Sequence, residues 1–196
     1  MNKLLVSITV LVLFLTGCAT NKMSEDKYSG FLDNYDQLEP SKKYPQTRVY
    51  IAPDADFSIY SAYMIDPVYV VLPGGMAQPE DQLFNNIAKT YHDELIAAFE
   101  AEGFTIVNEI GPNVARITSA VTGVYSSADG AFSKTKARII MEAKVTDATT
   151  SKLLGSVIDL QTGQTLKSAE DIVTLDNFRP VLRAWAKRFS SAMARL

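Results

Sequence analysis

The 196-residue sequence contains one cysteine, Cys18, and one histidine, His92. A single cysteine excludes any internal disulfide, so the fold depends on its hydrophobic core. A zinc site needs three or four Cys, His or carboxylate ligands, and a Ser–His or Cys–His catalytic pair would have to use His92. We therefore expect no metal, no cofactor and no catalytic residues, and we interpret the chain as a non-enzymatic protein.

The sequence also lacks a hydrophobic run long enough to cross a membrane. Its longest candidate, residues 4–15, has twelve residues, whereas a transmembrane helix needs roughly 20. The run follows the positively charged start Met1-Asn2-Lys3 and ends at Leu15-Thr16-Gly17-Cys18. A short apolar segment between a basic start and small residues is typical of a secretory signal peptide, which we assign to residues 1–17.

Leu15-Thr16-Gly17-Cys18 resembles the lipobox of bacterial lipoproteins at all four positions. The resemblance implies cleavage between Gly17 and Cys18, a diacylglycerol on the Cys18 sulfur, and acylation of the new α-amine with a chain such as palmitate. Two or more acyl chains anchor a protein stably in a membrane. Ala19 follows in place of the aspartate that marks inner-membrane retention, which favours an outer-membrane anchor facing the periplasm. The alternative is an ordinary signal peptide with Cys18 near its cleavage site.

The mature chain has little net charge. Removal of Lys3 with the signal peptide leaves 18 basic and 22 acidic residues, a formal charge of −4. This balance gives no support to nucleic-acid binding. Residues 18–27 are polar and aperiodic and predict a lipidated tether, whose nine residues after the cysteine reach at most ~30 Å. Residues 28–196 have the length of a single domain.

Hydrophobic periodicity predicts an α+β fold. Helical spacing predicts long amphipathic helices over 79–102, capped by Gly103, and from an N-cap at Asp176 to the last residue, and a shorter helical segment over 28–40. β-rich or alternating patterns predict strands over 48–53, 68–72, 104–108, 114–124, 135–147 and 152–160. We expect a mainly antiparallel sheet of about five strands, with the two long helices on one face and solvent on the other.

Tyrosines provide the candidate partner-binding residues. Seven of the nine lie in the first 70 residues, and residues 57–72 are unusually apolar for a connection. Rings that bury area and still form hydrogen bonds are useful on protein and glycan surfaces. We therefore select Tyr60, Tyr63 and Tyr69, with packing in the core as the alternative.

Two charged sets have weaker interpretations. Asp54, Asp56 and Asp66 could ligate calcium, but their spacing matches no EF-hand, so a solvated loop is favoured. The last helix carries a basic face that could touch anionic lipid headgroups or could simply be solvated. It comprises Arg179, Arg183, Lys187, Arg188 and Arg195.

Four ordered segments resemble the bacterial lipoprotein family called domain of unknown function 3313. They are Tyr28 to Pro40 after the lipobox, Gly111-Pro112 leading into Arg116-Ile117-Thr118, Glu142 to Leu154 with its Asp147-Ala-Thr-Thr turn, and Ala184-Trp185-Ala186. The match spans nearly the whole mature chain, but Ser151 stands where the family usually has glycine. The resemblance implies a cellular location and a fold, and it does not identify a chemical reaction.

The layout also resembles, more loosely, periplasmic lipoprotein domains related to the TolB N-terminal domain. That group includes cofactors that stimulate peptidoglycan synthases, and we use this as an analogy of fold. We expect a binding or accessory module, held to the membrane through Cys18, whose partner is an envelope protein or peptidoglycan. The alternatives are an envelope hydrolase with an unrecognised site and an oligomeric lipoprotein resembling those of curli export. The sequence leaves the oligomeric state open.

Overall fold

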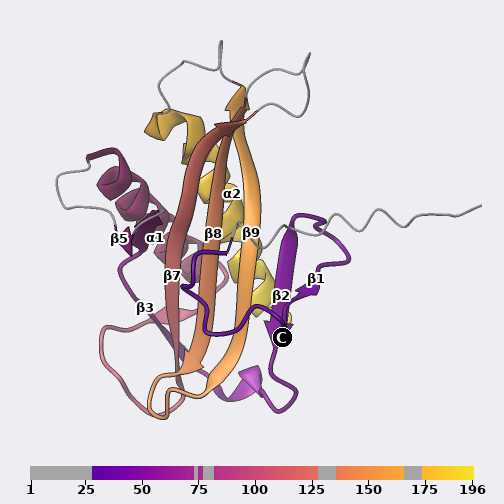
Figure 1. Ribbon diagram of the computed structural model, residues 1–196. Coiled ribbons are helices and arrows are strands. Elements are labelled where there is room, and N and C mark those ends of the chain that lie inside the picture. The colour runs from indigo at the N-terminus through magenta and orange to yellow at the C-terminus, as the bar shows by residue number, and fades with distance from the viewer. Residues whose placement is uncertain (1–27, 73–74, 77–81, 128–135, 166–173) are drawn as a thin grey trace, which may run out of the picture.

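The computed structural model describes residues 28–72, 75–76, 82–127, 136–165 and 174–196. The predicted signal peptide, lipidation site and tether lie outside these residues. Two long helices, α1 (Gln82–Ala101) and α2 (Leu175–Met193), pack together on one face of a twisted sheet (Figure 1). The strands are β1 (Glu39–Pro40), β2 (Thr47–Ile51), β3 (Ala62–Ile65), β4 (Tyr69–Leu72), β5 (Gly75–Met76), β6 (Thr105–Ile106), β7 (Val114–Ser127), β8 (Lys136–Asp147) and β9 (Leu153–Thr165).

The sheet is mixed and larger than expected. Its order is β1-β2-β9-β8-β7-β3-β6, with β4 also pairing with β7 and β5 with β4. The long hairpins β7–β8 and β8–β9 and the β2–β9 pair are antiparallel, as predicted, but β3 and β4 run parallel to β7, and β6 runs parallel to β3. The prediction of about five mainly antiparallel strands was therefore partly wrong. Parallel pairing needs a crossover, which α1 provides, and periodicity along one segment does not reveal its direction.

The two long helices occur where periodicity placed them. The α1 stripe of Ile87, Tyr91, Leu95 and Phe99 is fully buried against the sheet and α2. Gly103 ends α1 in the left-handed conformation, with φ of +89°, as its predicted capping role requires. The predicted N-cap of α2 is wrong by two residues, because Thr174 occupies that position and exchanges hydrogen bonds with Asn177 in a capping box.

Residues 28–38, which we call the strap, cross the sheet face opposite the helices (Figure 1). The strap contains turns and bends, so the predicted helix over 28–40 was wrong, although its apolar residues dock as expected. Leu32 and Leu38 pack against Ile140 and Ile158 of the outer sheet face. The strap bonds its own turns partly through the Tyr35 hydroxyl, which accepts from two strap amides, and so needs no helical hydrogen bonds.

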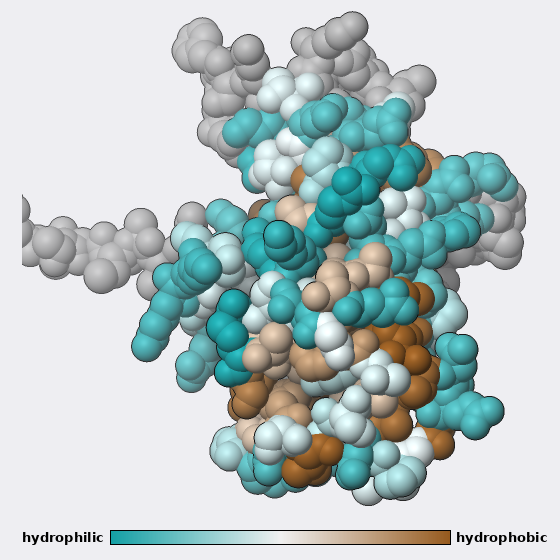
Figure 2. Space-filling model, turned by 180° about the vertical axis from the view of Figure 1, so that it is seen from behind, coloured by the Kyte–Doolittle hydropathy of each residue, from teal (hydrophilic) through white to brown (hydrophobic). Residues whose placement is uncertain are grey.

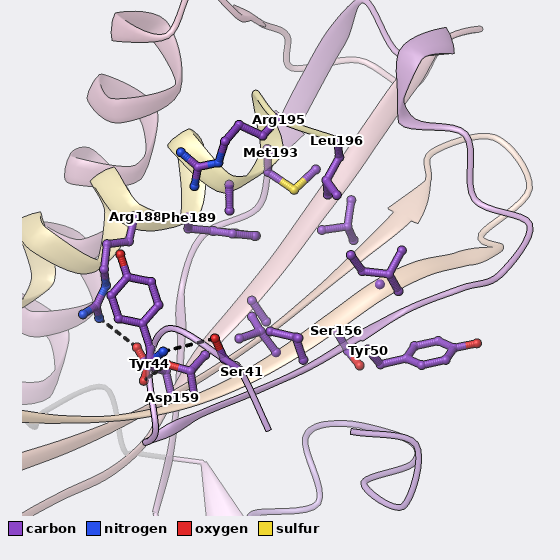
Figure 3. Close-up of a pocket in the computed structure, with 18 of the residues that line it drawn as sticks. Ser41, Tyr44, Tyr50, Ser156, Asp159, Arg188, Phe189, Met193, Arg195 and Leu196 are labelled. Atoms are coloured by element: carbon purple, nitrogen blue, oxygen red, sulfur yellow. Dashed lines mark hydrogen bonds and ion pairs between the residues drawn. The ribbon is translucent and has the colours of Figure 1, made fainter. Parts of the chain in front are cut away.

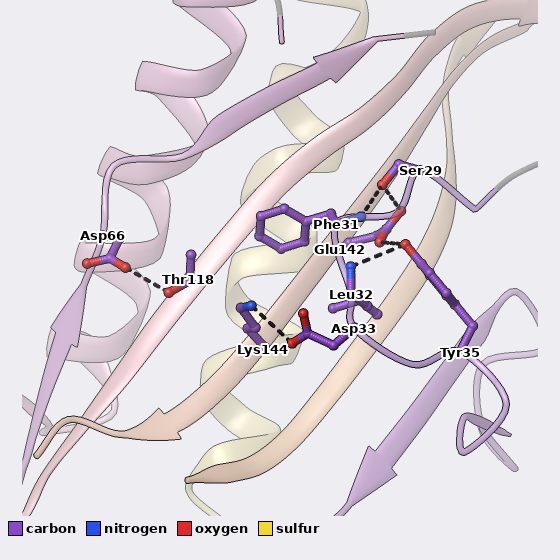
Figure 4. A network of polar contacts seen from close by, with 9 residues as sticks. All are labelled: Ser29, Phe31, Leu32, Asp33, Tyr35, Asp66, Thr118, Glu142 and Lys144. Atoms are coloured by element: carbon purple, nitrogen blue, oxygen red, sulfur yellow. Dashed lines mark hydrogen bonds and ion pairs between the residues drawn. The ribbon is translucent and has the colours of Figure 1, made fainter. Parts of the chain in front are cut away.

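The strap also corrects the expectation of a wet outer sheet face. Glu142 of β8 is completely buried beneath it and accepts hydrogen bonds from the Ser29 hydroxyl at 2.8 Å and the Tyr35 hydroxyl at 2.6 Å (Figure 4). Burial, followed by the contact with Glu142, raises the pKa of the Tyr35 phenol. A charged residue in an alternating strand pattern normally indicates solvent, and here a distant segment covers it.

Candidate functional site

The candidate site is a groove between the C-terminal half of α2 and the β2 edge of the sheet. The helix α2 packs on β8 and β9, whereas β2 lies one strand further out. Side chains of β2 and β9 that point to the helix face therefore border an open pocket of about 320 Å³. We call this pocket the α2 groove. Its lining includes Ser41, Lys43, Tyr44, Thr47, Val49, Ile51, Phe57, Ala143, Val145, Gly155, Val157, Asp159, Trp185, Arg188, Phe189, Ala192, Met193, Arg195 and Leu196.

The walls of the α2 groove are mainly hydrophobic. On one side, Ile51 of β2 is 46% exposed, and on the other, Leu196 just after α2 is 52% exposed. Figure 2 shows hydrophobic side chains gathered on the lower half of this helix-bearing face. The apolar stripe of α2 thus continues to Leu196, past the residues that the core covers, and its last turns border the hollow as well as the core. Such a bordered apolar hollow is the usual form of a binding site.

A buried ion pair closes one end of the groove (Figure 3). Arg188 Nη2 lies 2.9 Å from Asp159 Oδ2, and the Asp159 side chain is 1% exposed. Asp159 also accepts hydrogen bonds from Thr47 Oγ1 and Gln161 Nε2, both at 2.7 Å, while the Tyr44 ring lies 4.9 Å from the Arg188 guanidinium. Burial raises the pKa of the Asp159 carboxyl, and its hydrogen bonds and Arg188 oppose this rise.

The charged side chains of the groove are one carboxylate and three cations. The Asp159 carboxylate is occupied by three partners from β2, β9 and α2, which fix it in place. Two further cations, Lys43 and Arg195, line the groove, and neither forms an ion pair with a carboxylate of the described residues. Within the described ranges, no cluster of three or more His, Cys, Asp or Glu residues could hold a metal ion. The arrangement can enclose an apolar group and present positive charge beside it.

The predicted tyrosines do not form one site. Tyr63 is 1% exposed and packs between Phe99 and Phe104 in the core. Tyr60 is buried, and its hydroxyl donates to Asp147 Oδ2 at 3.1 Å; burial and this contact raise its pKa to about 12. Only Tyr69 exposes much of its side chain, 41%, on the outer sheet face near Phe31 of the strap. Partner binding through Tyr69 stays a prediction, whereas Tyr60 and Tyr63 contribute to packing.

The other candidates have separate structural contacts. Asp54 pairs with Lys152, Asp56 caps the short 3-10 helix Phe57–Ile59, and Asp66 forms a buried ion pair with Arg116. His92 Nε2 lies 3.3 Å from the Ile65 carbonyl. These side chains are each held by a different partner, and the structure does not bring them together.

The basic face of the last helix is divided by the fold. Arg188 and Arg195 line the α2 groove, whereas Arg183 pairs with Glu94 of α1 and Arg179 with Asp176. Sequence analysis missed the groove because its walls come from separate segments. One signal was present: the predicted apolar stripe of the last helix runs on to Leu196, further than the sheet covers it.

Several known proteins are similar to this chain. The Escherichia coli K12 protein called uncharacterized lipoprotein YdcL is 25% identical over 194 residues, covering 87% of each chain. Among solved structures, the PelC dodecamer from Paraburkholderia phytofirmans covers 76% of this chain and 95% of that one, with 10% identity and a TM-score of 0.46. A minor lipoprotein from Acinetobacter baumannii covers 70% and 94%, with 11% identity and a TM-score of 0.42.

The family match confirms the resemblance seen in the sequence. It extends over residues 27–189, which include the strap, the whole sheet and most of α2. No helix among the described residues is long and apolar enough to cross a membrane. The chain belongs to the family described as Protein of unknown function (DUF3313).

Proposed function

We propose that this chain is a lipoprotein of the outer membrane, anchored through Cys18 and facing the periplasm, whose domain is a non-enzymatic binding module. In this proposal the α2 groove is the binding surface. The observation that carries it is an apolar hollow, bordered by exposed Ile51 and Leu196, in a domain whose buried carboxylates are already paired.

The location rests on the lipobox and on the relative named a lipoprotein. Ala19 after the cysteine supports outer-membrane sorting. A tether that reaches at most ~30 Å would keep the groove within a few nanometres of the bilayer. Density-gradient separation of the two membranes tests this part: we expect the chain in the outer-membrane fraction, and a version whose residues 1–18 are replaced by an ordinary cleavable signal peptide in the soluble periplasmic fraction. Recovery of the wild-type chain with the inner membrane would contradict the sorting.

Photocrosslinking in cells tests the binding surface. The photoreactive residue p-benzoylphenylalanine replaces Ile51 or Leu196 in the lipidated chain, and, as a matched control, Ile110, which is 59% exposed and does not line the groove. We expect discrete adducts, with a protein or with a lipid, from the two groove positions and none at the same masses from position 110. Equal adduct patterns from all three positions, or no adduct from either groove position, would overturn the assignment of the groove.

A further inference from the structure

The α2 groove carries information about the kind of ligand as well as its place. A volume of about 320 Å³ is at the small end of the range for ligand pockets, roughly 300–1,000 Å³, and suits one slender chain rather than two. Its walls are formed by aliphatic, aromatic and thioether side chains such as Val49, Val157, Phe189 and Met193. A ligand that fills it should be apolar along most of its length.

The walls disfavour a peptide as that ligand. Each residue of a peptide brings an amide N–H and a carbonyl that must be paired when buried. The polar groups at the closed end are used within the protein, since Thr47 and Gln161 donate to Asp159 and Arg188 pairs with it. An acyl chain has no polar group along its length and leaves none unpaired.

Charge identifies the other end of the ligand. Three cationic side chains, Lys43, Arg188 and Arg195, line the groove against two negative charges, the Asp159 carboxylate, which Arg188 neutralises, and the α-carboxylate of Leu196. Lys43 lies over the Tyr44 ring, 5.3 Å from its centroid, beside the ion pair, and Arg195 lies after the last turn of α2. The groove thus has an excess of positive charge at its rim, which complements an anionic headgroup.

We infer that the α2 groove binds a long-chain fatty acid, with its hydrocarbon chain along the apolar walls and its carboxylate attracted by the cations at the rim, Lys43 and Arg195. This inference rests on the proposed function, because it names the ligand of the same groove. A membrane within reach of the tether would supply such amphiphiles. A diacyl phospholipid fits less well, since its second chain has no place in a pocket of this volume.

Photoaffinity labelling of the lipidated full chain tests the inference. The protein is reconstituted in phosphatidylcholine vesicles that contain a trace of diazirine-bearing palmitic acid, illuminated, digested and mapped by mass spectrometry. We expect adducts on peptides that contain Ile51 and on the end of α2, and competition by unlabelled palmitic acid. The same diazirine on a phosphatidylcholine chain should label these peptides much less. Equal labelling by both probes, or labelling spread evenly over the surface, would overturn the inference.

Two kinds of variant sharpen the experiment. Lys43→Glu with Arg195→Glu should lower labelling roughly fivefold or more, because the attraction of two exposed cations for the carboxylate is replaced by repulsion. Arg179→Glu with Lys187→Glu makes the same charge change outside the groove and should leave labelling unchanged. Ala192→Trp should abolish labelling by filling the groove, and far-UV circular dichroism checks that it folds. If this variant does not fold, the comparison of the two charge-reversal variants still tests the inference. An equal loss of labelling in both charge-reversal variants would refute recognition of the carboxylate.

The result can be separated from that of the proposed function. If position 51 forms protein adducts in cells but palmitic acid does not label the groove, the groove remains a binding surface and the fatty acid is rejected as its ligand. Failure of both experiments would overturn both.

Discussion

Replacement of Arg188 by methionine should destabilise the domain through the acid that it leaves behind. The Asp159 side chain is 1% exposed and that of Arg188 is 29% exposed, so the variant leaves a buried carboxylate without its cationic partner. Breaking a buried ion pair costs about 3–5 kcal/mol, and the hydrogen bonds from Thr47 and Gln161 should reduce this to ~2–3 kcal/mol. For a domain of this length the loss corresponds to roughly 5–10 °C in Tm.

The matched control is Arg183→Met, which removes an exposed ion pair. Arg183 also has a bonded carboxylate partner, Glu94, but its own side chain is 70% exposed. Exposed pairs contribute about 0–1 kcal/mol, so this variant should be nearly as stable as the wild type. Urea denaturation followed by circular dichroism measures both. If Arg188→Met lost no more stability than Arg183→Met, the account of the groove's closed end would be refuted.

Acidity gives the same prediction a second test. Arg188 opposes the burial that raises the pKa of Asp159, so its removal should raise that pKa further. A carboxyl whose folded pKa lies above its unfolded value contributes stability below the unfolded pKa and loses it as pH rises through the folded pKa. The deficit of Arg188→Met should therefore be small near pH ~4 and grow toward neutral pH. A deficit independent of pH would point to lost packing instead.

Three further substitutions test the strap, the packing of β9 against α2 and one turn. Tyr35→Phe should cost about 1–3 kcal/mol in urea denaturation, because it removes a donor to a buried carboxylate, whereas Tyr28→Phe keeps the stacked ring and should be near neutral. Gly163→Ala places a Cβ 2.5 Å from the Asn177 carbonyl and should lower stability by roughly 1–3 kcal/mol, while Gly111→Ala, with its nearest atom at 3.7 Å, should not. Ser151 has φ of +60°, so Ser151→Gly should raise Tm by a few degrees through about 1 kcal/mol of relieved strain; a lowered Tm would show that the turn is unstrained.

Hydrophobic periodicity predicted those elements that bury one repeating apolar face. Both long helices and the β7–β8–β9 meander follow from their own residues, because an apolar stripe must be buried whichever element covers it. It failed over 28–40, where Leu32 and Leu38 are spaced as in a helix but anchor an irregular strap. The short β3, which pairs with the distant strands β6 and β7, also had no local signal.

The groove was unpredictable for a related reason. Its walls combine β2 with β9 and the end of α2, both of which follow β2 by more than a hundred residues along the chain. Each segment alone looks like ordinary core. The sheet is wider than the helix layer that covers it, and this difference leaves Phe189 and Leu196 beside a hollow. The difference is a property of packing rather than of any one segment.

If the chain is anchored through Cys18, as we propose, the strap has a mechanical consequence. Any pull on the anchor reaches the domain first at residues 28–38, whose attachment to the sheet is concentrated at Leu32, Leu38 and the Glu142 hydrogen bonds. Load applied there would peel the strap before it shears the long strands beneath. Eleven released residues would add up to ~35 Å of extended chain and about double the distance that the domain can move from its anchor. The strap would then act as a reserve of chain that is bound to the sheet at rest and released under tension.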